Sequence, residues 1–284
     1  MMNFLGCDCK YSAADIVIFG APFDGTASNR PGSRFAPAAM RIESYGIETY
    51  SPYVDKDLSD LRIHDGGDLE LTFGNPAKVV DIIEVHTKKI VAANKIPVML
   101  GGEHLVTLGA AKAVFAKYSD LHMLHFDAHT DLRDEYLGEK LSHATVIRRC
   151  WDFMDFGRFN NRIHQFGIRS GTREEFEWGK EHTRLQKFDF HGLENVVALL
   201  AGKPIYLTID LDVIDPSEFC GTGTPEAGGV SFTALREAIE MMSRLNIVAA
   251  DIVELAPQLD ASGASTALAC KVLREMLLSI GRWL

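Results

Sequence analysis

Six carboxylate and imidazole side chains follow apolar runs in this sequence, at spacings that suit a metal centre. Asp127, His129 and Asp131 alternate in LHFDAHTD, and Asp210 and Asp212 alternate in PIYLTIDLD. Alternate residues of a β-strand point to the same side, so each group would crowd like charges into a small volume. Such crowding is costly unless positive charge lies between the carboxylates. The pattern therefore predicts bound cations.

The sixth residue, His104, closes the run IPVMLGGEH. Six ligands exceed the four of a tetrahedral zinc site, and none is a thiolate. Four carboxylates and two imidazoles favour two divalent ions of intermediate hardness, with Mn²⁺ the best fit, and would leave a neutral cluster. A DxD pair alone is weak evidence, because Asp also caps helices and forms turns, and a lone His is rarely a ligand. The prediction depends on finding three such clusters in one chain.

The elements that must position these residues follow from hydrophobic periodicity. Short apolar runs predict buried strands at 14–22, 96–104, 121–131, 161–170, 204–215 and 247–257, and helical patterns occupy 75–94, 231–246 and 265–284. This alternation predicts an α/β fold, a three-layer α-β-α sandwich with a central, mostly parallel, doubly wound sheet. We expect one domain over residues 1–284. In such sheets ligands bind at the carboxyl ends of the strands, where the polar clusters lie.

Composition limits the class of protein. The 284 residues carry a formal net charge of −10, which disfavours nucleic acid as a partner. No apolar run approaches membrane-spanning length and the first residues lack the pattern of a signal peptide, so we expect a cytoplasmic protein without a membrane partner. Five scattered cysteines predict reduced thiols. The close pair Cys7 and Cys9 favours a mobile N-terminus over a zinc site.

Six segments in this order resemble the signature of the ureohydrolase superfamily of arginases and agmatinases: GGEH, FDAHTD, SHATVIRR, DLDVIDP, GTGTPEAGG and DIVELAP. The resemblance covers about residues 12–284. It implies the arginase/deacetylase-like form of the α/β sandwich, two Mn²⁺ ions held by the six residues above, and a homo-oligomer, either trimer or hexamer. It further implies hydrolysis of a guanidino group, for which paired ions would make hydroxide available at neutral pH.

The resemblance also implies roles for single residues. Asp131 would be catalytic and transfer a proton, with His104 and Asp131 on opposite ions, and His143 would be a catalytic, substrate-facing proton carrier. Glu254 would bind the guanidinium through two charge-assisted hydrogen bonds, and Thr224 would lie near the substrate. Without the resemblance, His143 suits a surface histidine. A turn is the alternative for Glu254 and Thr224, although an acid at the carboxyl edge of the sheet favours binding for Glu254. His125 shares the ligands' parity, and we expect a buried supporting histidine. Cys220 stands where many relatives carry proline, which leaves the rigidity of that loop in doubt.

Agmatine is the predicted substrate, giving putrescine and urea. The segment LRDEYLGEKLSHA lacks the Asn/Ser pair with which arginases hold an amino-acid head group. Its acids Asp134, Glu135 and Glu139 match a bare amine instead. The alternatives are hydrolysis of guanidinobutyrate or another guanidino acid, and a ureohydrolase-like protein that binds metal without catalysis. A urea-release assay separates the substrates, and metal analysis separates the non-catalytic alternative.

Overall fold

The computed structural model describes residues 2–154 and 161–281. Within them, eight strands form one sheet in the order β4-β1-β5-β10-β9-β6-β7-β8, and each pair of neighbours is parallel. The strands are β1 (Ile16–Ala21), β4 (Ile63–Asp68), β5 (Ile96–Gly101), β6 (His122–Phe126), β7 (Ile163–Ile168), β8 (Arg184–Lys187), β9 (Pro204–Asp210) and β10 (Asn246–Val253). A separate antiparallel hairpin joins β2 (Tyr50–Ser51) to β3 (Lys56–Asp57).

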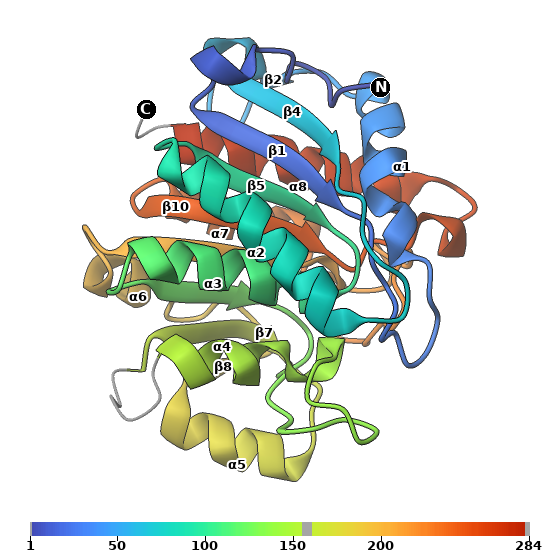
Figure 1. Ribbon diagram of the computed structural model, residues 1–284, viewed down its shortest axis with the longest axis vertical. Helices are drawn as coiled ribbons and strands as arrows, with labels where there is room; N and C mark the ends of the chain where they lie inside the picture. Colours follow the sequence, from blue (N-terminus) through green and yellow to red (C-terminus); the bar gives the residue numbers. More distant parts are fainter. Residues whose placement is uncertain (1, 155–160, 282–284) are drawn as a thin grey trace.

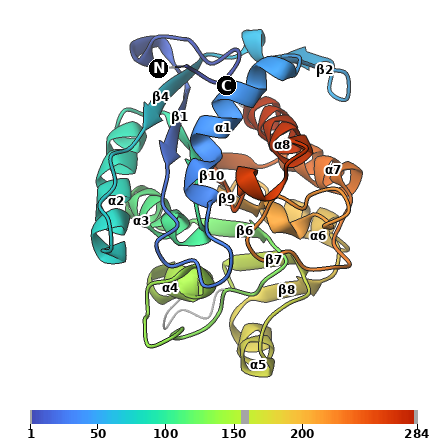
Figure 2. The same ribbon diagram turned by 90° about the vertical axis from the view of Figure 1, so that its right-hand side faces the viewer.

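Helices cover both faces of the sheet, as Figure 2 shows. They are α1 (Ala36–Glu43), α2 (Pro76–Ala92), α3 (Thr107–Lys117), α4 (Val146–Met154), α5 (Arg173–His182), α6 (Leu193–Leu199), α7 (Phe232–Met242) and α8 (Ala264–Ile280). Apolar residues of α2, α3 and α4 bury one face of the sheet, and those of α1, α6, α7 and α8 bury the other. The predicted three-layer, mostly parallel α/β architecture is confirmed.

The strand order brings distant parts of the chain to one edge of the sheet. Strand β6 follows β5 in the sequence, but in the sheet β10 and β9 lie between them (Figure 1). The carboxyl ends of β5, β10, β9 and β6 are therefore adjacent. A reversal of strand order of this kind is where doubly wound sheets bind ligands.

All six predicted strands are present, but each is shorter at its carboxyl end, most of all the two that lead into the aspartate clusters. The run 121–131 is a strand only to Phe126, and 204–215 only to Asp210. Strands β4 and β8 were not predicted, because β4 carries His64, Asp65 and Asp68 and β8 is a polar edge strand. The predicted helix 265–284 corresponds to α8, and its residues 282–284 lie outside the described residues. No helix in the described ranges is long and apolar enough to cross a bilayer.

The prediction of a mobile N-terminus is wrong for the segment around Cys7. Phe4 and Cys7 are buried in the core. The backbone N–H of Phe4 donates to Oδ2 of Asp65 at 2.8 Å, and that of Cys9 donates to the carbonyl of Ile63 at 3.0 Å. An aromatic anchor and hydrogen bonds to β4 thus hold a segment whose local sequence shows no regular pattern. All five cysteines are free thiols, as predicted.

Candidate active site

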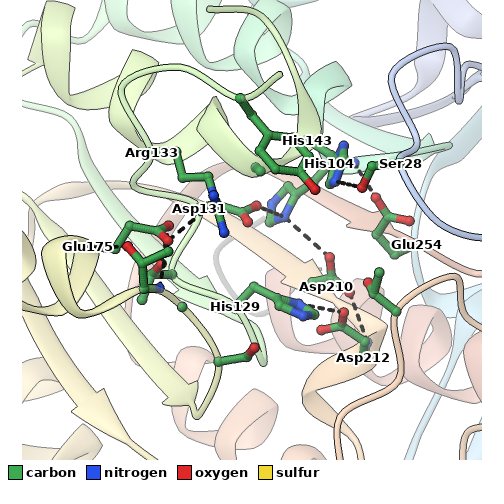
Figure 3. Close-up of a pocket in the computed structure, with 17 residues that line it drawn as sticks. Ser28, His104, His129, Asp131, Arg133, His143, Glu175, Asp210, Asp212 and Glu254 are labelled. Carbon is green, nitrogen blue, oxygen red and sulfur yellow. Dashed lines mark hydrogen bonds and ion pairs between the residues drawn. The ribbon is translucent and has the colours of Figure 1, made fainter. Parts of the chain in front are cut away.

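The six predicted ligands converge at the carboxyl ends of β5, β6 and β9, and Figure 3 labels all of them except Asp127. Nδ1 of His104 lies 3.1 Å from Oδ2 of Asp127, 3.1 Å from Oδ2 of Asp131 and 3.3 Å from Oδ2 of Asp210. These four groups come from three strands that are far apart in the sequence. Their side chains are buried or nearly so, which places four ionisable groups in a region of low dielectric.

A second group of ligand atoms adjoins the first. Nδ1 of His129 lies 3.0 Å from Oδ2 of Asp212 and 3.5 Å from Oδ1 of Asp127. Asp127 belongs to both groups, which is the position of a carboxylate shared by two ions. His104 and Asp131 lie in the same group, so the expectation that they hold opposite ions does not fit this geometry.

The loop after β6, rather than strand parity, brings its three residues together. The strand ends at Phe126, and the following backbone turns so that the N–H of His129 donates to Oδ1 of Asp127 at 2.5 Å. Asp131 has φ +53, in the left-handed region that non-glycine residues seldom occupy. Arg169 and Ser170, just after β7, both donate to the carbonyl of Ala128 and fix the loop from the neighbouring strand.

The chemistry of the donor set fits divalent metal ions. Within the described ranges, Nδ1 of His104 and Oδ2 of Asp212 are buried and make no hydrogen bond. Burial alone would lower the pKa of His104, but its carboxylate neighbours outweigh burial and raise that pKa well above the usual value. Burial, and then the charge of Asp127, raise the pKa of Asp131 to about 7. The groups thus compete for positive charge, and their oxygen and nitrogen donors suit two divalent ions.

His125 occupies the supporting position expected for it. Its ring is fully buried, and its nitrogens lie 2.7 Å from Oδ2 of Asp127 and 3.1 Å from Nε2 of Gln165. The amide of Gln165 donates to Nδ1, so Nε2 carries the hydrogen and donates to Asp127. His125 is close enough to the cluster to count among its possible ligands. Because both of its nitrogens already have protein partners, it instead orients Asp127.

A cavity of about 290 Å³ opens beside the cluster. Its lining includes His143, Thr224 and Glu254 together with the ligands His104, His129, Asp131, Asp210 and Asp212. Figure 3 shows Glu254 and His143 facing the same space as Asp131. The three residues predicted to contact substrate therefore share one cavity with the candidate metal site.

One carboxylate oxygen of Glu254 is hydrogen-bonded to the backbone. Oε1 accepts the backbone N–H of His104 at 2.8 Å. The residue follows β10 directly and has φ +67, so the backbone bends sharply as the strand ends. Burial, and then the charge of Glu103, raise the pKa of Glu254 well above its usual value. A bound cation such as a guanidinium would relieve that penalty.

His143 is fixed by the loop that precedes α1. Its backbone N–H donates to Oγ1 of Thr26 at 3.1 Å, and Thr26 in turn donates to Oε1 of Glu103 at 2.6 Å. Nε2 lies 3.2 Å from Oγ of Ser28. Burial, which the backbone contact with Thr26 only partly offsets, lowers the pKa of His143 to about 4, so the imidazole is neutral near pH 7. Thr26 and Ser28 were not predicted, because only the folded chain brings them to His143.

The Gly-rich loop that carries Thr224 is clamped on both sides. Nδ2 of Asn29 and Nε of Arg30 both donate to the carbonyl of Gly223, at 3.0 and 3.1 Å. On the other side, the N–H of Gly221 donates to Oγ of Ser265 at 3.0 Å. The doubt raised by Cys220 in place of proline is therefore answered by neighbouring contacts, which hold the loop without a restricted φ at its entry.

The acids predicted to hold an amine do not line the cavity. Asp134 is exposed and pairs with Arg149 at 2.6 Å, and Glu135 and Glu139 are exposed. Arg133 and Glu175 line the cavity instead. That part of the substrate prediction is wrong, because the three acids turn to solvent and Asp134 also pairs with Arg149 of α4.

Arg133 and Glu175 form a paired wall opposite Glu254 (Figure 3). Nε of Arg133 lies 3.4 Å from Oε2 of Glu175, and its guanidinium stacks 4.7 Å from the ring of Tyr136. Glu175 also accepts hydrogen bonds from Oγ1 of Thr130 at 2.6 Å and from the N–H of Thr172 at 2.8 Å. The sequence signal for Glu175 is the pattern TREE, a helix-capping box that says nothing of a cavity.

Comparison with known proteins agrees with this fold. The model of the arginase family matches residues 14–279, and the chain belongs to that family. An agmatinase of Bacillus subtilis (strain 168) is 46% identical over 279 residues, covering 97% of this chain and 95% of its own length. A guanidinobutyrase of Pseudomonas aeruginosa is 34% identical over 281 residues, covering 94% and 87%. The crystal structure of the agmatine ureohydrolase of Thermoplasma volcanium superposes with a TM-score of 0.90 at 34% identity, covering 100% of this chain and 95% of that one.

Proposed function

We propose that this protein is a ureohydrolase that converts agmatine and water to putrescine and urea, with two Mn²⁺ ions at the six-residue cluster. One observation carries the proposal: a single cavity joins that cluster to His143 and to Glu254. The agmatinase of Bacillus subtilis, similar over nearly the whole chain, supports agmatine as the substrate.

The geometry suggests which residues would hold each ion. His104 and Asp131 would serve one ion, and His129 and Asp212 the other, with Asp127 between them and Asp210 beside His104. The absence of thiolates and the balance of four carboxylates against two divalent charges favour Mn²⁺. When bound, such a pair of ions lowers the pKa of water and so supplies hydroxide near neutral pH.

The protein's own groups would bind the guanidinium and move the protons. Oε2 of Glu254 would accept from the planar guanidinium and fix its orientation. The reaction joins the water oxygen to the guanidinium carbon and breaks the bond from that carbon to the alkyl nitrogen. Both water protons end on the leaving amine. Asp131 and the neutral imidazole of His143 are bases beside the cavity that would carry them.

A guanidino acid such as guanidinobutyrate is the second candidate substrate, and Arg133 is the observation that favours it. The carboxylate tail of such a substrate would pair with Arg133. The amine tail of agmatine would instead pair with Glu175, in place of the Arg133–Glu175 ion pair. Arg133→Gln separates the two. Removal of the cation should leave or lower the KM for agmatine if the amine is the natural tail. It should raise the KM for guanidinobutyrate severalfold if the carboxylate is.

The direct test is urea release from agmatine, arginine and guanidinobutyrate by the Mn²⁺-loaded protein. We expect the highest kcat/KM with agmatine and no turnover by Asp131→Asn. A higher kcat/KM with guanidinobutyrate would replace the proposed substrate. Fewer than two bound ions per chain under manganese-replete conditions, without urea release, would favour the non-catalytic alternative.

We further propose a homo-oligomer, trimer or hexamer, and a cytoplasmic location, both from the family resemblance. Light scattering coupled to gel filtration tests the first. A monomeric mass of about 31.4 kDa would contradict it.

A further inference from the structure

A cluster of buried hydroxyl groups lies behind His104, on the side away from the cavity. Nε2 of His104 lies 2.9 Å from Oγ1 of Thr208, which donates to Oδ1 of Asp251 at 2.6 Å. Oδ2 of Asp251 accepts from the hydroxyl of Tyr206 at 2.6 Å and from Oγ1 of Thr107 at 2.9 Å. All five side chains are buried. None of the four residues other than His104 belongs to the candidate ligands.

The sheet itself creates this arrangement. Thr208 of β9 and Asp251 of β10 are direct partners in the parallel register, so their side chains leave the sheet on the same side. Thr107 begins α3 and packs over that side. Thr208 lies two residues before the candidate ligand Asp210 in β9, so its hydroxyl lies farther from the carboxyl end of the strand than that carboxylate.

Counting hydrogens fixes the direction of every bond in the cluster. An ionised Asp251 has no hydrogen to give, so three hydroxyl groups donate to it. Thr208 has a single hydrogen and gives it to Asp251, which leaves only a lone pair for His104. Nε2 of His104 must therefore carry the ring hydrogen. Its Nδ1 then presents a lone pair toward Asp127, Asp131 and Asp210.

We propose that Thr208 and Asp251 are positioning residues that hold His104 in the one tautomer and ring orientation able to bind a metal ion. The proposal rests on the metal centre proposed above. A hydrogen on Nδ1 would point into the carboxylates and occupy the position of the ion. Partners of this kind, which hold the remote nitrogen of a ligand histidine, commonly change metal affinity 10–100-fold when removed.

Burial raises the pKa of Asp251, and the hydroxyl donors act against that rise. The donors thus have a second effect besides packing, since they favour the ionised form on which the direction of the bonds depends. Tyr206 and Thr107 support Asp251, while Thr208 alone touches His104.

The test compares Thr208→Val with a matched buried threonine. Thr87 on α2 is equally buried, and its hydroxyl makes no hydrogen bond within the described residues, so Thr87→Val repeats the same change of side chain without touching the cluster. Mn²⁺ binding to each metal-free protein is measured by titration calorimetry, and retained metal is measured after dialysis. Thermal unfolding of the metal-free proteins monitors folding.

We expect Thr208→Val to bind one of the two ions 10–100-fold more weakly and the other within threefold of wild type. Thr208→Ser, which keeps the hydroxyl, should restore both affinities, and Thr87→Val should leave them unchanged. Wild-type binding of both ions by Thr208→Val would overturn the proposal. Equal weakening by Thr87→Val would assign the effect to packing. A wild-type protein that binds fewer than two ions would instead refute the metal centre, so the two failures are distinguishable.

Discussion

The contact between Glu254 and the backbone of His104 makes Glu254→Gln an informative perturbation. One carboxylate oxygen accepts the N–H of His104 at 2.8 Å, and the proposed guanidinium contact uses the other. Glutamine offers only one acceptor oxygen. Whichever way its amide lies, the NH₂ group must face a donor, either the N–H of His104 or the guanidinium itself.

The size of the effect follows from that mismatch. Loss of a hydrogen bond to a charged group costs about 1.5–3 kcal/mol, and a buried donor left without a partner costs about 1–3 kcal/mol more. The sum, about 2.5–6 kcal/mol, corresponds to a loss of roughly 10²–10⁴-fold in kcat/KM at about 1.4 kcal/mol per tenfold. The loss should fall mainly on KM, because the contact already forms in the bound ground state.

The assay is steady-state urea release from agmatine, with metal content measured on the same preparations. Glu135→Gln is the matched control, because Glu135 is exposed and outside the cavity, and it should leave kcat/KM within threefold of wild type. A Glu254→Gln variant that holds two ions and keeps kcat/KM within threefold would refute the role assigned to Glu254.

Stability gives an independent readout of the same change. Burial and the charge of Glu103 raise the pKa of Glu254, so the folded protein loses stability as the pH rises above the usual carboxyl value. Glutamine never ionises. The metal-free Glu254→Gln protein should therefore unfold at a higher temperature than wild type at pH 7, and the gain should fade toward pH 4.

Three further outcomes are expected. Thr26→Val should lower kcat/KM in the urea assay about 5–150-fold, because it removes the hydroxyl that accepts the backbone N–H of His143. Thr26→Ser keeps that hydroxyl and should retain activity. A Thr26→Val variant with wild-type activity would contradict a role for Thr26 in holding His143. Chelation of the Mn²⁺-loaded protein should lower its Tm. Free Mn²⁺ at about 1,000 times its Kd should restore about 4 kcal/mol of unfolding free energy. A Tm that does not change with chelator would count against a metal centre. Burial lowers the pKa of His164 to about 3, so the free energy of unfolding of wild type should fall by about 2 kcal/mol between pH 7 and pH 5, whereas that of His164→Gln should not. Denaturant titrations measure this fall, with exposed His191→Gln as the control. Equal losses in all three proteins would refute the prediction.

The sequence predicts the candidate site well where chemistry and strand ends coincide. Parallel strands end at one edge, so His104, Asp127 and Asp210 could be expected to meet even though they lie far apart in the chain. The detailed means differ from the expectation. Asp131 reaches the site through a left-handed backbone turn rather than through strand alternation, and a single sequence carries no direct sign of such a turn at Asp.

Residues whose role depends on a distant partner were not predictable in the same way. Asp134 had the right charge for an amine, but Arg149 on α4 draws it away from the cavity. Thr208 and Asp251 look like ordinary strand residues until the register makes them partners. Strand β8, at the polar edge of the sheet, lacks the apolar run that marks the central strands.

The position of β9 and β10 in the middle of the sheet has a consequence for biosynthesis. A nascent chain that ends before Pro204 contains the strands of β4-β1-β5 and of β6-β7-β8, but it lacks the two strands that fill the gap between them in the finished sheet. The two later strands close that gap and bring Asp210 and Glu254 with them. A nascent chain therefore lacks Asp210 and Asp212 until β9 has been made, and it lacks Glu254 until β10 has followed.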